Sequence, residues 1–109
     1  MNVRLYLLQR GTAALMLPLI LVHLAVIFYA TRQGLTAADI LGRTRGSITW
    51  ALFYGIFVFA AAIHASIGVR NILTEWTPFP RSRAGLISVA FGAAVAALGV
   101  RAIYAVVFA

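Results

Sequence analysis

The chain has 109 residues, of which 63% are hydrophobic, and its formally charged residues are nine arginines, one aspartate and one glutamate. Soluble domains usually carry about 25% charged residues, whereas this chain carries 10% and has a mean hydropathy of +0.99. This composition excludes a soluble enzyme and a disordered chain. The net charge of +7 comes from arginines that stand singly between apolar runs, which is typical of membrane flanks and not of a nucleic-acid-binding face. Without cysteine, these residues form no disulfide framework, iron–sulfur site or covalent c-type haem attachment.

Three long runs lack any charge: 11–31, 46–69 and 84–100. A membrane-spanning helix needs roughly 20 apolar residues, and the first two runs supply them. The third does so when Arg101 lies near the far interface and extends its guanidinium outward. We therefore expect spans at about 11–31, 47–70 and 84–105, within one membrane domain that covers residues 1–109. The expected fold class is all-α, a three-transmembrane-helix bundle that forms part of a larger helix bundle.

The aromatic residues and the connections agree with these spans. Every Tyr and Trp falls near an expected membrane interface, where these residues are enriched. The connection 32–45 has room for one or two helical turns, with Thr36 as a possible N-cap. Pro78 and Pro80 stop a helix in the connection 70–83. Five arginines at one membrane face against four at the other favour a cytoplasmic N-terminus.

Two histidines, His23 and His64, lie within the expected spans, and no acidic residue does. An ionisable residue inside a membrane is a candidate for a functional site. Burial favours neutral imidazole, which is the form that ligates metals. Zinc would need three or four ligands, whereas b-type haem needs one or two axial ligands. Haem therefore fits this inventory better than zinc; the alternative is a histidine bonded to a neighbouring helix.

The helical neighbourhood of His64 is favourable for a flat macrocycle. The residues closest to its face on a helix are Phe57, Ala60, Ala61, Gly68 and Asn71, of which three are small. Small residues let a planar group approach the helix, and Arg70 and Asn71 follow nearer the membrane surface, where haem propionates need partners. The alternative is that the small residues only permit tight helix packing.

The face of His23 is bulkier, and its residue chemistry favours a structural role. If Thr12 and Arg70 share one membrane surface, His23 and His64 differ in depth by several Å. Packed helices are also only 8–10 Å apart. A single haem bound by both histidines of one chain is therefore not expected.

Two further features lie at the ends of the spans. Arg10, with Thr12 close by, could bind a quinone carbonyl or a haem propionate, the alternative being an ordinary positive flank. In the third span, small residues share one helical face: Gly85, Ser88, Gly92, Ala96 and Gly99. This stripe predicts close packing, against the other spans or against a second subunit.

The segment 64–76, His-Ala-Ser-Ile-Gly-Val-Arg-Asn-Ile-Leu-Thr-Glu-Trp, resembles the second-helix motif H-x-x-x-G-[IV]-R-x-x-x-x-[DE] of the cytochrome b anchor subunits of succinate dehydrogenase and fumarate reductase. The segment 9–13, Gln-Arg-Gly-Thr-Ala, is similar to the entry of that family's first helix. The resemblance implies that His64 ligates haem b, with Gly68, Arg70 and Asn71 in the cofactor-binding segment. It implies that Arg10, together with Thr12 and Tyr6, contributes to a quinone site.

Three positions depart from the family pattern. Ala13 replaces the usual glycine of the entry motif, and Tyr6 stands where close relatives have a quinone-contacting serine. His23 resembles the first-helix histidine of two-haem anchors, which makes it a second candidate for a haem-iron ligand.

The resemblance implies a membrane anchor that passes electrons between an iron–sulfur subunit and membrane quinone, in the bacterial cytoplasmic membrane. The implied partners are a flavoprotein subunit, the iron–sulfur subunit, a second membrane-anchor subunit or second copy, and the lipid bilayer; the implied cofactor is one haem b, or two shared with a partner chain. Two alternatives stay open. One is a haem-free helix-packing or transport protein, and the other is the haem b anchor of a different membrane dehydrogenase.

Overall fold

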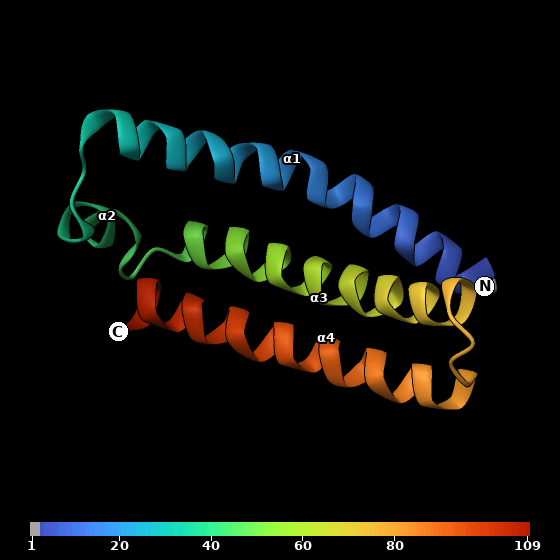
Figure 1. Cartoon of the computed structure of the whole chain (residues 1–109). Helices are drawn as coiled ribbons and strands as arrows, with labels where there is room; N and C mark the ends of the chain where they lie inside the picture. Colours follow the sequence, from blue (N-terminus) through green and yellow to red (C-terminus); the bar gives the residue numbers. More distant parts are fainter. Residues whose placement is uncertain (1–2) are drawn as a thin grey trace.

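The computed structural model describes residues 3–109, and within this range the chain is helical with no strand. The three long helices are α1 (Val3–Gln33), α3 (Ile48–Trp76) and α4 (Arg81–Ile103). A short helix, α2 (Ala37–Thr44), lies in the connection between α1 and α3, and α4 continues into a π-helical turn, η1 (Tyr104–Phe108). The all-α prediction is confirmed. Helix α3 lies between α1 and α4, and the N-terminus lies at the same end as the α3–α4 connection (Figure 1).

Three helical segments are long and apolar enough to cross a membrane: Val3–Gln33, Ile48–Trp76 and Arg81–Phe108. Each extends beyond the uncharged run from which its span was predicted. The reason is physical: the arginines mark where the hydrocarbon ends, whereas a helix continues until its capping residues end it, and Pro18 lies inside α1 without ending that helix. The chain is therefore a multi-pass membrane protein.

The helix ends follow from local sequence. Gly34, with a φ of +64°, ends α1, and the N–H of Leu35 donates to the carbonyl of Ala30 at 3.0 Å. The expected N-cap is confirmed: Thr36 forms a capping box with Asp39 at the start of α2. The hydroxyl of Ser47 accepts from the N–H of Trp50 at the start of α3.

The small-residue stripe of α4 packs against α3 of the same chain. A Cβ on Gly92 would lie 2.8 Å from the Cβ of Ser66, and one on Gly99 would lie 2.5 Å from a methyl carbon of Val58. The Ser66 hydroxyl also donates to the carbonyl of Ser88 at 2.9 Å. These two helices can approach this closely only because glycine stands at both positions.

Helix α1 buries fewer residues than α4 does, since Thr12 is its one buried residue within the described range. Many large apolar side chains of α1 are exposed, among them Leu17, Leu21 and Phe28. In a membrane these side chains face lipid or other helices, as the sequence predicts for one part of a larger bundle.

Candidate functional site

A polar contact between α1 and α3 lies at the centre of the candidate site. The hydroxyl of the buried Thr12 lies 3.2 Å from Nδ1 of His64. The same hydroxyl donates its single hydrogen to the backbone carbonyls behind it, to Leu8 at 2.7 Å and more weakly to Gln9 at 3.1 Å. Because this hydrogen points to the carbonyls, we infer the tautomer of His64 in which Nδ1–H donates to the hydroxyl. In a neutral imidazole this leaves Nε2 with the free lone pair, as a metal-ligating histidine requires.

His64 borders a groove on the α1 side of α3, with a volume of about 440 Å³. We name it the histidine groove; its lining residues are Gln9, Arg10, Ala13, Ala14, Leu17 and His64. Its floor on α1 is small and apolar, whereas its polar residues, Gln9 and Arg10, lie about one turn nearer the N-terminal end. The groove therefore combines a surface for a flat apolar group, one nitrogen donor and polar partners at the membrane edge.

The residue chemistry of this groove fits a haem. Haem needs an imidazole with a free nitrogen, side chains small enough for a planar ring, and polar groups for its propionates. His64 supplies the first, Ala13 and Ala14 the second, and Gln9 and Arg10 the third. In the described part of the chain, no three His, Cys, Asp or Glu residues come together as a metal site. A group that needs only an axial ligand from this chain is thus the one that the residues accommodate.

Gln9 is a site residue that sequence reasoning missed. Its Oε1 atom is buried and has no hydrogen-bond partner within residues 3–109. A Cβ on Gly68 would lie 3.6 Å from Nε2 of Gln9, so Gly68 borders the Gln9 amide and is not among the residues that line the histidine groove. The available signal was spacing: Gln9 lies three residues before Thr12 and shares its helical face.

Arg10 and Tyr6 form a pair at the end of the histidine groove. The Cζ atom of Arg10 lies 5.7 Å from the centroid of the Tyr6 ring, a cation–π contact, and both side chains are exposed. Thr12 does not belong to this exposed pair. It is 8% exposed, and its hydroxyl is used within the chain, so the structure gives no support to the quinone contact expected for it.

Arg70 and Asn71 are adjacent in sequence but lie on different faces of α3. Arg70 lines another groove, together with Arg4 and Ser88, because six residues along a helix turn it about 120° away from His64. Asn71 lies seven residues from His64, close to the same face, and is half-buried. Of these two predicted cofactor residues, Asn71 is thus better placed for a group bound at His64.

His23 lies in an aromatic cluster deeper in the bundle. Its ring meets the rings of Tyr54 and Phe57 edge-on, with centroids 5.7 and 5.6 Å away. Its Nδ1 atom is buried and has no hydrogen-bond partner in the described part of the chain. Because Thr12 is level with His64 and not with Arg70, His23 lies about 16 Å from His64 along α1. The depth difference is thus larger than the several Å expected, and the two histidines cannot ligate one haem.

The fold and this site define a class: a multi-pass helical membrane protein with intramembrane histidines. A comparison with protein-family models identifies the particular family within this class. The family model of the succinate dehydrogenase/fumarate reductase transmembrane subunit matches residues 1–100, and the chain belongs to this family. Neither the comparison with curated proteins nor that with solved structures found a match.

Proposed function

We propose that this membrane subunit binds haem b through His64 and connects the iron–sulfur subunit of its complex with membrane quinone. The observation that carries this proposal is the Thr12–His64 contact, which occupies Nδ1 and leaves Nε2 free as a ligand. When bound, haem b supplies a one-electron redox centre between the iron–sulfur subunit and quinone. A second membrane-anchor subunit, or a second copy of this chain, would supply a further ligand.

The chain's own residues bind and orient in this proposal. Thr12 fixes the tautomer and the ring orientation of His64. Ala13 and Ala14 leave room for a planar ring, while Gln9 and Arg10 lie towards the end where propionates need hydrogen bonds. Asn71, seven residues after His64, is a further proposed partner. The roles predicted for Gly68 and Arg70 in cofactor binding stay predictions, and their neighbours favour other roles.

Quinone binding is assigned to the exposed end of the same groove. The Arg10 guanidinium can donate to a quinone carbonyl, and the Tyr6 ring beneath it restricts its position. This places the quinone site on the side of the N-terminus, which we assign to the cytoplasmic face of a bacterial membrane. The flavoprotein and iron–sulfur subunits would then cover that face.

His23 is a candidate ligand for a second haem. The supporting observations are its unpartnered, buried Nδ1 atom and its distance from His64. The opposing observation is its aromatic cage, because edge-on contacts to Tyr54 and Phe57 satisfy a structural histidine as well.

The deciding experiment is a dithionite-reduced minus oxidised visible spectrum of the purified complex, with haem quantified per copy of this chain. One haem supports His64 as the ligand and a structural His23. Two haems assign both histidines as ligands. The absence of a b-type signal would remove the ligand role of His64 and favour a haem-free anchor.

A further inference from the structure

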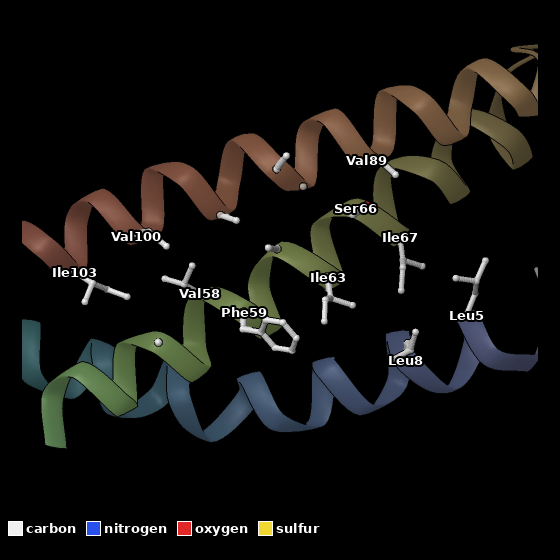
Figure 2. Close-up of a pocket in the computed structure, with 15 residues that line it drawn as sticks. Leu5, Leu8, Val58, Phe59, Ile63, Ser66, Ile67, Val89, Val100 and Ile103 are labelled. Atoms are coloured by element: carbon white, nitrogen blue, oxygen red, sulfur yellow. The ribbon is translucent and has the colours of Figure 1, made fainter. Parts of the chain in front are cut away.

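A second groove, of about 590 Å³, lies between α1, α3 and α4, and His64 is not among its lining residues (Figure 2). Its wall is apolar and includes Leu5, Leu8, Phe59, Ile63, Ala93 and Ala96. We name it the apolar groove. Along α3 it extends from Ile67 to Gly55, which is about 18 Å at 1.5 Å per residue. This length is close to that of one membrane leaflet, about half of a hydrocarbon core of about 30 Å.

An adjoining pocket of about 480 Å³ shares Leu5, Leu8 and Ser66 with the apolar groove, and we call it the mouth. Arg4 of α1 and Arg70 of α3 line this mouth, together with Ser66 and Ser88. Both serine hydroxyls already donate to carbonyls, that of Ser66 to Ser88 at 2.9 Å and that of Ser88 to Gly85 at 2.8 Å. The guanidinium groups are therefore the polar groups that the mouth offers to a ligand.

Neither acidic residue of the chain lines this mouth. The sequence has two, Asp39 and Glu75. Asp39 belongs to α2 at the far end of the bundle (Figure 1), and Glu75 does not line the mouth. Two positive charges thus stand at the membrane edge above an apolar channel one leaflet deep.

We propose that the apolar groove holds one acyl chain of an anionic phospholipid whose phosphate lies between Arg4 and Arg70. The charge of the mouth decides between the occupants. A quinone has neutral carbonyls, and an apolar helix of a partner would leave both arginines without a counter-charge. A subunit that covers the cytoplasmic face could supply carboxylates to the arginines, but it would not fill an apolar groove inside the membrane. A phosphate supplies a counter-charge to both arginines, and basic sites between membrane helices are known to hold anionic headgroups. This lipid site is independent of His64 and goes beyond the proposed haem function.

The test uses the intact complex, reconstituted in nanodiscs of equal parts phosphatidylglycerol and phosphatidylcholine, with retained lipid counted by native mass spectrometry. The wild type should retain phosphatidylglycerol in preference to phosphatidylcholine. Arg4→Gln should lower this retention about fivefold, which is the contribution of one arginine near a lipid headgroup. The matched control is Arg81→Gln, which removes the same charge at the same end but does not line the mouth, and it should leave retention unchanged.

A second pair of variants tests the acyl chain with both arginines intact. Ala93→Leu fills the apolar groove and should release the lipid, whereas Ala94→Leu, on the same helix but outside the groove, should not. Equal retention of the two lipids, or no effect of Arg4→Gln, would overturn the proposal. Loss of another membrane subunit from Ala93→Leu, with lipid retention unchanged, would also overturn it and identify the groove as a protein interface.

Discussion

The backbones of α3 and α4 form a closed contact at Gly92 and Gly99, with the apolar groove running along its edge, whereas the contact between α1 and α3 leaves a groove on either side. Gly92 and Gly99 bring α4 against Ser66 and Val58 of α3 with no room for a further methyl group. Between α1 and α3, the buried polar contact is that of Thr12 with His64, and ligand-sized space lies beside it. The difference separates a backbone contact made by glycine from a looser contact beside which we propose the haem.

The largest expected effect is the difference between variants of two α3 residues, His64 at the contact with α1 and Ser66 at the contact with α4. His64→Ala should abolish the binding of at least one haem, because it removes the axial nitrogen. Ser66→Ala, two residues away, should retain haem, since its hydroxyl donates to Ser88 on α4. The reduced-minus-oxidised spectrum of each purified complex measures this. An unchanged haem content in His64→Ala would sink the assignment.

Arg10→Ala should lower the rate of quinone reduction about 10- to 100-fold, the range expected for a lost charged hydrogen bond. Dicarboxylate turnover with an artificial acceptor should be unaffected, because that chemistry does not involve this chain. Arg32→Ala is the matched control: Arg32 also makes a cation–π contact, with Phe28, but at the other end of α1. Equal slowing by both variants would point to a general effect of surface charge.

Thr12→Val keeps the shape of the buried side chain but removes the acceptor for Nδ1–H of His64. We expect haem to be held about tenfold more weakly, as is typical when the partner of a ligating histidine is lost. The measurement is the rate of haem transfer to an excess of a soluble haem-binding protein. Thr12→Ser should restore slow transfer, and a valine variant that behaves like the wild type would show that the contact does not orient His64.

The closed contact is tested by two alanines on α4. Gly99→Ala places a methyl group against the stiff side chain of Val58 and should destabilise the bundle by about 1–3 kcal/mol. Gly85→Ala meets nothing within 4 Å and should be neutral or stabilising by up to about 1 kcal/mol. Thermal unfolding of the complex, followed by helical circular dichroism, compares them. A tolerant Gly99 would mean that α3 and α4 can separate without loss.

The features that sequence could predict are those set by local chemistry. The three spans follow from apolar runs between arginines, and the α2 cap follows from the Thr36–Asp39 spacing. The packing stripe of α4 follows from helical periodicity, although sequence did not reveal whether α3 or another subunit receives it. Family resemblance, and not spacing, gave His64 its weight as a ligand.

The features that escaped prediction depend on how the helices are aligned. The depth argument took Thr12 and Arg70 as one membrane surface, yet Thr12 is level with His64, and this increases the depth difference between His23 and His64. Arg70 follows the His64 motif in sequence but turns towards Arg4 in space. Gln9 gained importance only from the packed structure, in which its amide oxygen is buried with no hydrogen-bond partner among the described residues and the residue lines the histidine groove. Axial register between helices has no signal in a single sequence.

The smallest expected effect concerns α2, which lies in the connection between α1 and α3. The backbone N–H of Thr36, bonded to the Asp39 carboxylate at 2.8 Å, holds the pKa of Asp39 below its usual value, helped by the Thr36 side chain and by Arg43. A lowered pKa stabilises the cap above the unfolded-state pKa, which is about 3.9, and this stabilisation is lost as the pH falls through the folded-state pKa. Asp39→Asn should therefore speed amide exchange of α2 near neutral pH, relative to the wild type at the same pH, and the two should converge in acid. Because Thr44 anchors α2 to Val106, the effect should stay within α2 and leave α3 unchanged. Faster exchange spreading along α3 would instead show that the alignment of α1 with α3 depends on this cap.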